Sequence, residues 1–177
     1  MSKKDNIDNV KEERSTLSVI KEFSIYIVII IGILLIKKFV VTPIKVNGQS
    51  MMKTLHDGDI MIMNIIDYKM HGLKRFDIVI VDEGSELLIK RVIGLPGESV
   101  QYKDNELFIN GKKVKDNYGM GDTDDFSITL DDDEYFVLGD NRENSMDSRA
   151  FGAFPKEKIL GKTSLTIFPF NRLGNKE

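Results

Sequence analysis

The pattern of hydrophobic and polar positions divides the chain into three parts. Residues 1–22 are polar and carry five basic and five acidic side chains, which favours disorder or a loose amphipathic helix. Residues 23–36 contain no charged side chain. From residue 42 onward, short runs rich in isoleucine, valine and leucine are bounded by turn residues, as in β-strands. The pattern therefore predicts a polar N-terminal segment, an apolar segment and a β domain.

The apolar segment is long enough for a membrane anchor if it extends to residue 41. A membrane-spanning helix needs roughly 20 residues. The nineteen residues 23–41 reach this length if Lys37 and Lys38 extend their ammonium groups to the lipid–water interface. A buried core helix and a cleaved signal peptide are the alternatives, but no small-residue cleavage site follows the segment. We predict one uncleaved transmembrane helix.

The basic residues beside this segment predict its orientation. Five lie in residues 1–22, and Lys45 and Lys53 follow the apolar segment. This bias favours a cytoplasmic N-terminal segment, a single pass through the cell membrane, and a domain at residues 42–177 on the outer face.

Residues 42–177 are predicted to form an all-β domain. Asn110 and Gly111 are the preferred pair for a type I′ hairpin turn, and Asp104 and Asn105 indicate a turn before it. A small β insertion is therefore expected at about residues 99–133. No helical periodicity appears after residue 41, so no further helix is predicted. Other strands are predicted at residues 59–66, 76–83, 86–94, 134–140 and 158–170.

The composition excludes several kinds of site. The net charge of −3 offers no basic surface for nucleic acid. The absence of cysteine excludes disulfides, a thiol nucleophile and cysteine-ligated zinc. His56 and His71 have no second pair to complete a metal site, and both are expected to be exposed loop residues. The acidic runs at residues 121–126 and 131–134 lack the spacing of a calcium loop. We predict no metal and no cofactor.

Lys90 stands out in the run LLIKRVIG. Strand alternation places Lys90 on the same face as Leu88 and Val92, whereas Arg91 shares the other face with Ile89. One interpretation is an exposed edge-strand lysine that discourages aggregation. The other is a buried lysine whose pKa, about 10.4 in water, is lowered by burial until the amine can act as a base.

A nucleophile for such a base lies in the segment NGQSMMKTLHDGD, which follows the apolar segment. Serine–lysine pairs are one known way to activate a hydroxyl group. Since the chain has no cysteine and no convincing histidine triad, Ser50 with Lys90 is the most economical nucleophile and base.

Three segments resemble the signature motifs of type I signal peptidases, in the same order. Residues 48–55 (GQSMMKTL) resemble the serine motif, 90–98 (KRVIGLPGE) the lysine motif, and 139–152 (GDNRENSMDSRAFG) the third signature. The resemblance extends from about residue 23 to residue 170. It implies a β peptidase fold, related to that of self-cleaving repressors and held at the membrane by an N-terminal helix. It also implies cleavage of signal peptides from exported preproteins after small residues. The single anchor and small insertion are most similar to the compact enzymes of Gram-positive bacteria.

The resemblance also implies a role for individual residues. Ser50 would be the nucleophile, Lys90 the general base, and Ser145 a hydroxyl that helps to position the lysine. Asp147 and Arg149 would form a supporting ion pair. The residues implied to shape the same loop are Asp140, Asn141 and Arg142.

The substrate is expected to bind as an added β-strand beside residues 44–48 and 87–90, with small pockets that favour alanine. Met51 and Met52 have two interpretations, as core residues or as part of a surface that enters lipid. The residues predicted to contact substrate are Ile44, Val46, Gly48, Gln49, Met51 and Leu88.

The chain departs from the family pattern at two positions. Lys53 stands where the family usually has proline, and losing the fixed φ of proline is expected to loosen the turn that presents Ser50. If φ at Lys53 is near −65°, restoring proline would stabilise the protein. Gly48 stands where some members have a serine that helps to hold the oxyanion. A second backbone donor would then have to assist the Ser50 N–H.

Two other functions compete with this interpretation. A self-cleaving repressor shares the serine–lysine chemistry, but it needs a DNA-binding domain where this chain has an apolar segment. A membrane-tethered binding protein without activity would have no need for both Ser50 and Lys90.

Overall fold

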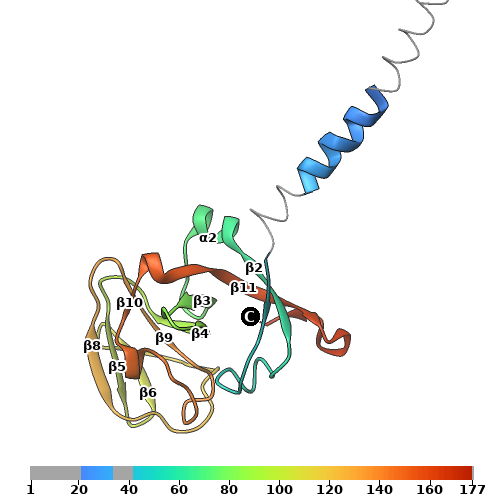
Figure 1. The fold of residues 1–177 in the computed structure, drawn as a ribbon. Helices are drawn as coiled ribbons and strands as arrows, with labels where there is room; N and C mark the ends of the chain where they lie inside the picture. The colour runs from blue at the N-terminus through green and yellow to red at the C-terminus, as the bar shows by residue number, and fades with distance from the viewer. Residues whose placement is uncertain (1–20, 34–41, 177) are drawn as a thin grey trace, which may run out of the picture. The chain divides into compact units, whose positions relative to one another are not determined.

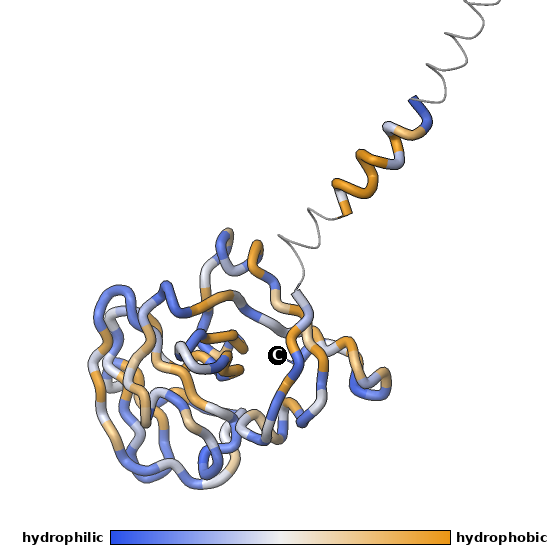
Figure 2. The backbone as a smooth tube through the Cα atoms, viewed as in Figure 1, coloured by the Kyte–Doolittle hydropathy of each residue, from blue (hydrophilic) through white to orange (hydrophobic). Residues whose placement is uncertain are grey.

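The computed structural model describes residues 21–33 and 42–176 of the chain, which forms two units, Met1–Val40 and Val41–Glu177. In the first unit, residues 21–33 are helical and largely hydrophobic after the polar first residues (Figure 2). Within the described ranges, no helix combines the length and the apolar character needed to cross a membrane. The predicted anchor at residues 23–41 is described only up to residue 33, and most of the predicted polar segment 1–22 also lies outside the described residues.

The second unit is mostly β, as predicted, and is built on one curled eight-stranded sheet (Figure 1). The strand order is β1-β2-β11-β3-β4-β9-β10, with β12 paired to β11. The strands are β1 (Thr42–Lys45), β2 (Ile60–Asn64), β3 (Ile78–Asp82), β4 (Leu87–Gly94), β9 (Glu134–Leu138), β10 (Phe154–Pro155), β11 (Ile159–Phe168) and β12 (Gly174–Asn175).

The strand β11 joins the two halves of this sheet. It comes late in the sequence, yet it lies between β2 and β3 and pairs antiparallel with both. In the sheet, β2 is therefore separated from β3 and β4 by β11. This strand begins more than sixty residues after β4 ends.

The strand β4 is paired differently along its two halves. Residues Leu87 to Arg91 pair with β3 on one side. Only Arg91 to Gly94 also pair with β9 on the other side. In the described part of the chain, the edge at residues 87–90 therefore has no strand partner on that side, and its backbone groups are available to an added strand.

A second sheet forms the region predicted as an insertion. Its order is β7-β6-β5-β8, from β5 (Ser99–Lys103), β6 (Glu106–Ile109), β7 (Lys112–Val114) and β8 (Phe126–Thr129) (Figure 1). Both predicted turns are present, because Asp104 and Asn105, and then Asn110 and Gly111, have positive φ.

Short helices, which the sequence analysis did not predict, interrupt the strands. The predicted strand 59–66 ends at Asn64, whose side chain accepts a hydrogen bond from the Asp67 N–H and caps α2 (Ile65–His71). A second helix, α3, spans Ser148–Phe151. Two 3₁₀ turns cover Lys156–Lys158 and Phe170–Arg172. The prediction of no helix after residue 41 was wrong, because helices of one or two turns are too short to show a periodic pattern.

Three clusters of buried side chains hold the sheets together. One includes Val79, Val81 and Leu88, and a second includes Met51, Leu55 and other apolar residues of β2 to β4. The third packs the small sheet against Ile93 and Phe136. Since Met51 and Leu55 belong to the second cluster, the segment that carries Ser50 is fixed to the core on its C-terminal side.

Candidate active site

Ser50 and Lys90 lie within hydrogen-bonding distance of each other. Lys90 Nζ is 2.8 Å from Ser50 Oγ, although the residues are forty positions apart in the sequence. Ser50 lies in the loop between β1 and β2, and Lys90 lies in β4. Met51 is buried rather than exposed to lipid, so it serves as a core residue beside the candidate nucleophile.

The environment of Lys90 favours the neutral amine. The residue is 3% exposed, which contradicts the interpretation as an exposed edge lysine. Burial lowers the pKa of Lys90 below its ordinary value, while the carboxylates of Asp147 and Glu86 oppose this effect. The shift is in the direction that a general base requires at neutral pH.

The loop after β9 holds the backbone of the Ser50 segment. Asn141 N–H donates to the Ser50 carbonyl at 2.9 Å, and the Asn141 side chain donates to the Gln49 carbonyl at 3.2 Å. Gly139 packs against the same place, since a Cβ added there would lie 2.5 Å from the Ser50 carbonyl oxygen and 2.1 Å from Ser145 Oγ. A side chain at position 139 would therefore displace the candidate nucleophile or its neighbour.

A fully buried ion pair connects this loop to β4. Arg91 donates to both carboxylate oxygens of Asp140, at 2.8 and 2.7 Å, and both side chains are fully buried. Thr54 also donates to Asp140, at 2.5 Å, and the Arg91 guanidinium lies 3.7 Å above the Tyr118 ring. The residue next to the candidate base thus anchors the loop that holds the candidate nucleophile.

Asp147 and Arg149 form the ion pair that the resemblance implied. Arg149 donates to Asp147 at 2.9 Å, and the Gly139 N–H donates to the same carboxylate at 3.0 Å. Burial raises the pKa of Asp147, but the hydrogen bonds from Arg149 and Gly139 outweigh it and hold the pKa below its ordinary value. Asp147 is therefore a carboxylate near Lys90 at neutral pH.

Ser145 is buried beside this pair without the contact that was expected. Its Oγ forms no hydrogen bond within the described part of the chain, so the expected hydrogen bond that would position Lys90 is absent. The oxygen instead lies against Gly139, where an added Cβ would meet it.

Arg142 connects the loop to the insertion. It donates to the Gly139 carbonyl at 2.9 Å, to Tyr102 at 2.6 Å and to Asp116 at 2.6 Å. Burial raises the pKa of Tyr102 above its ordinary value. Through Arg142, β5 of the small sheet is therefore linked to Gly139 in the loop that holds Ser50.

The groove beside Ser50 and Lys90 has a volume of about 580 Å³. It runs between β1 with the following loop on one side and residues 86–90 on the other. All six residues predicted to contact substrate line it, although Val46, Met51 and Leu88 are mostly buried. The groove is also lined by Lys45, Asn47, Leu87 and Ile89, which lie within the predicted ranges 44–48 and 87–90. The sequence analysis missed three lining residues, Glu86, Asn144 and Met146.

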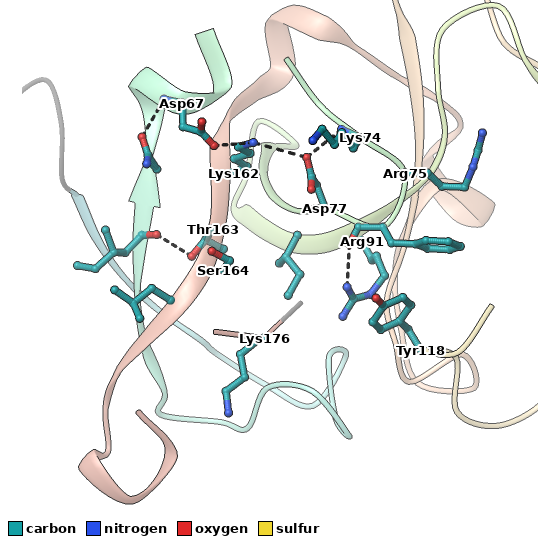
Figure 3. Close-up of a pocket in the computed structure, with 15 residues that line it drawn as sticks. Asp67, Lys74, Arg75, Asp77, Arg91, Tyr118, Lys162, Thr163, Ser164 and Lys176 are labelled. Carbon is teal, nitrogen blue, oxygen red and sulfur yellow. Dashed lines mark hydrogen bonds and ion pairs between the residues drawn. The ribbon is translucent and has the colours of Figure 1, made fainter. Parts of the chain in front are cut away.

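A second cavity of about 350 Å³ shares no lining residue with this groove (Figure 3). Its charged groups are largely paired: Lys162 contacts Asp67 at 2.5 Å and Asp77 at 3.9 Å, and Arg91 binds Asp140. Because Ser50 and Lys90 lie in the first groove, we assign the chemistry to that groove.

The two departures from the family pattern both have positive φ. Gly48 has φ of +84°, and its N–H donates to Asp57 at 2.8 Å, so glycine suits the turn there. Lys53 also has φ of +84°, and its Nζ donates to the Asn117 carbonyl at 3.2 Å. The condition for a stabilising proline, φ near −65°, is therefore not met.

Neither histidine forms a hydrogen bond with Ser50. His71 is exposed, in α2 rather than in a loop, and lies 2.7 Å from Asp67. His56 is half-buried rather than exposed, and its Nδ1 has no hydrogen-bond partner in the described part of the chain. Over the ranges 21–33 and 42–176, no three histidine, aspartate or glutamate side chains are arranged to hold a metal ion.

Three residues that shape the site were missed from the sequence. Arg91 had a visible signal, because an arginine on the apolar face of a buried strand needs a partner. Gly139 and Thr54 lie in the segments 139–152 and 48–55, which resemble signature motifs, but their individual roles depend on which segments approach them in space.

Comparisons with known proteins agree on one family. The family model described as signal peptidase, peptidase S26, matches residues 18–168. The chain is 40% identical to signal peptidase I of Bacillus amyloliquefaciens, over 92% of this chain and 96% of that protein. It is 39% identical to signal peptidase I T of Bacillus subtilis (strain 168), over 98% of each chain.

A solved structure of a signal peptidase I from Enterococcus faecalis V583 is also similar. It is 35% identical, with a TM-score of 0.47, and the match covers 51% of this chain and 95% of that chain. Because the family model and these relatives extend over most of the sequence, the chain belongs to the signal peptidase family, peptidase S26, and is a serine peptidase of that family.

Proposed function

We propose that this protein is a membrane-bound endopeptidase that removes N-terminal signal peptides from exported preproteins with a Ser50–Lys90 dyad. The observation that carries the proposal is the 2.8 Å contact between Lys90 Nζ and Ser50 Oγ, made by a lysine that is buried. A buried amine without its proton can accept the hydroxyl proton as the oxygen attacks.

The reaction proceeds by acyl transfer. Lys90 Nζ takes the Ser50 proton, and Oγ attacks the scissile carbonyl carbon to give a tetrahedral oxyanion. The Ser50 N–H makes no hydrogen bond within the described part of the chain, so it is free to donate to that oxyanion. The carbon–nitrogen bond then breaks, and protonated Lys90 gives its proton to the leaving amine. Water, deprotonated by Lys90, hydrolyses the ester and regenerates Ser50.

The signal peptide binds in the groove as an added strand. Residues 87–90 offer backbone groups without a strand partner on one side, and β1 forms the opposite wall. Ile44, Leu88 and Met146 line the groove. The preference for small residues next to the scissile bond is the one that the family resemblance implies.

The apolar segment at residues 23–41 anchors the enzyme, with the N-terminal segment in the cytoplasm and residues 42–177 on the outer face. The described helix at residues 21–33 supports an anchor in this segment, because its large apolar side chains from Phe23 to Ile33 are all at least half exposed. Such a helix is not stable in water, and lipid would cover it.

The test is cleavage of a purified preprotein by the full-length chain, with the new N-terminus identified by mass spectrometry. We expect one cut, after a small residue, and no cut by Ser50→Ala or Lys90→Ala. Lys103→Ala, which removes an exposed lysine of the small sheet, is the matched control and should cut normally. Binding of the preprotein without any cleavage by the unaltered chain would instead identify an inactive binding protein.

A further inference from the structure

The groove beside Ser50 carries an acidic side chain that the reaction does not use. Glu86 immediately precedes β4 and, among the described residues, is the only acidic residue that lines the groove. Its side chain is exposed. The carboxylates of Glu98 and Glu106 are paired with basic side chains, whereas Glu86 forms no ion pair within the described ranges. A carboxylate without a partner at the wall of a peptide-binding groove is free to pair with a basic group of the peptide.

The backbone places Glu86 on the same face as the candidate base. The Glu83 N–H donates to the Glu86 carbonyl at 3.1 Å, which continues the pairing of β3 with β4. Strand alternation then puts Glu86, Leu88 and Lys90 on one face. Burial lowers the pKa of Lys90, and the carboxylates of Asp147 and then Glu86 oppose this lowering. The charge of Glu86 therefore acts toward the reacting end of the groove.

The other exposed charge of the groove is Lys45, which lies on the opposite wall. Lys45 is not among the charged groups that act most strongly on Lys90, whereas Glu86 is. A peptide strand paired with residues 87–90 extends directly past Glu86, because these residues are consecutive along one edge of the sheet. For a strand bound to β4, the adjacent charge is therefore that of Glu86.

Only one side of the scissile bond can lie along this edge. From Arg91 onward β4 is paired with β9, so an added strand can follow β4 only beside residues 87–90. The small residues that the resemblance implies precede the scissile bond, so the signal-peptide side of the bond occupies this edge. A strand advances ~3.3 Å per residue. Glu86, which is four residues before Lys90, therefore lies opposite a peptide residue about four positions before the bond.

We propose that Glu86 is a specificity-determining residue, which favours lysine or arginine about four residues before the scissile bond and disfavours aspartate or glutamate there. This inference rests on the proposed function and adds a charge preference to it. The group recognised is an ammonium or guanidinium ion. Because the contact lies away from the reacting atoms and is the same before and during the reaction, it should affect KM rather than kcat.

The test is a set of peptides cleaved by the full-length chain in a non-ionic detergent. Each peptide keeps small residues at the first and third positions before the bond. Each carries lysine, glutamine or glutamate at one position, which is moved from the fourth to the sixth before the bond. The measured quantity is the ratio of kcat/KM between the lysine and glutamate peptides. Any effect of Glu86 on the protonation of Lys90 is the same for both peptides, so the ratio cancels it.

At the position opposite Glu86, the lysine peptide should have a kcat/KM about two- to fivefold above that of the glutamine peptide, as for an exposed ion pair. The glutamate peptide should lie below the glutamine peptide. Both differences should appear in KM and should vanish in ~1 M salt, which screens exposed charges. Glu86→Gln should remove the preference, and Glu86→Lys should reverse it.

Glu83→Gln is the matched control, because it removes the same charge three residues away and Glu83 does not line the groove. This variant should keep the preference for lysine. Loss of the preference in both Glu83→Gln and Glu86→Gln would mean that the peptide senses the net charge of the domain, and it would overturn the inference.

The remaining outcomes separate this inference from the proposed function. Equal cleavage of the three peptides by the unaltered chain, at every position, would overturn the charge preference and leave the peptidase activity intact. A preference for the glutamate peptide would also overturn it and would identify Lys45 as the dominant charge. Cleavage of none of the peptides by the unaltered chain would contradict the proposed function, and the inference with it.

Discussion

The clearest prediction at the scale of single residues concerns the protonation of Lys90. Because burial lowers the pKa of Lys90 in the folded protein, the rate with a peptide substrate should rise with pH through a value below the ordinary lysine pKa. Lys90→Arg should be inactive, since arginine keeps its proton. The measurement is kcat/KM against pH, with stability followed in parallel.

The stability of the protein should change in the same pH interval. Between the folded and ordinary pKa values of Lys90 the unfolded chain binds the extra proton, so the free energy of unfolding should rise with pH across that window. A rate that is flat with pH up to the ordinary lysine pKa would contradict the role of Lys90 as the base.

A second residue-scale prediction concerns Lys53. At φ of +84°, lysine has a strained backbone, so Lys53→Gly should stabilise the protein by roughly 0.5–1 kcal/mol. Lys53→Pro should destabilise it by ~3 kcal/mol or more, because proline cannot adopt this φ. Urea denaturation measures both. Lys115→Gly is the matched control, an exposed loop lysine without positive φ, and it should not be stabilising. A stable, active proline variant would show that the turn has a different backbone.

The third residue-scale prediction uses two crowded glycines. Gly139→Ala should lower kcat by about 100-fold, because an added Cβ must displace Ser50 or Ser145 and a shift near 1 Å has this effect. Gly94→Ala is equally crowded, but against Val100 and Leu130, so it should reduce stability while the folded fraction keeps its kcat. Equal loss of kcat in both variants would mean that the position of Gly139 has no special effect on Ser50.

The amino-acid sequence identified the candidate nucleophile and base more readily than the residues that support them. Ser50 and Lys90 could be singled out because the chain has no cysteine and no convincing histidine triad, and because both lie in segments that resemble signature motifs. The positive φ of Lys53 could not be predicted, because lysine gives no local signal for a left-handed backbone. The burial of the Ser145 hydroxyl against Gly139 depends on contacts between segments.

At the scale of secondary-structure elements, the decisive contact is the ion pair between β4 and the loop after β9. Asp140→Asn would leave the Arg91 charge buried without a carboxylate, which should cost about 3–5 kcal/mol of folding free energy and loosen the hydrogen bond from Asn141 to Ser50. Glu106→Gln, which breaks the exposed pair with Lys113, is the control and should have little effect. Denaturant titration checks both, and equal effects would show that the Arg91 pair is no more important than a surface pair.

Elements with strong local signals were predictable, and short ones were not. The hairpin turn at Asn110 and Gly111 could be predicted because these two residues alone favour the positive φ that the turn requires. The run 59–66 is apolar throughout most of its length, so only the capping side chain of Asn64 marks where β2 ends and α2 begins.

At the scale of the whole molecule, the β domain should fold without the N-terminal segment. A chain that lacks residues 1–40 keeps every strand and all three buried clusters. We expect a β-type circular dichroism spectrum and a cooperative thermal transition, with better activity in the presence of lipid. A truncated chain that remains unfolded would place part of the core before residue 41.

The order of strands in the sheet was beyond what sequence patterns reveal. Periodicity identifies strands one at a time, whereas pairing depends on segments far apart, and nothing local indicates that β11 lies between β2 and β3. That Ser50 and Lys90 lie close together could be inferred from their chemistry. It could not be inferred from the order of the strands along the sequence.

This order has a consequence during biosynthesis. The segment with Ser50 belongs to the side of β1 and β2, and Lys90 belongs to the side of β3 and β4. The strand between the two sides leaves the ribosome after all four of these strands. A nascent chain that ends before residue 159 holds Ser50 and Lys90 without the strand that joins their two sides. Synthesis of the first ninety residues is therefore not enough to form the groove between them, which needs β11 to pair with both β2 and β3.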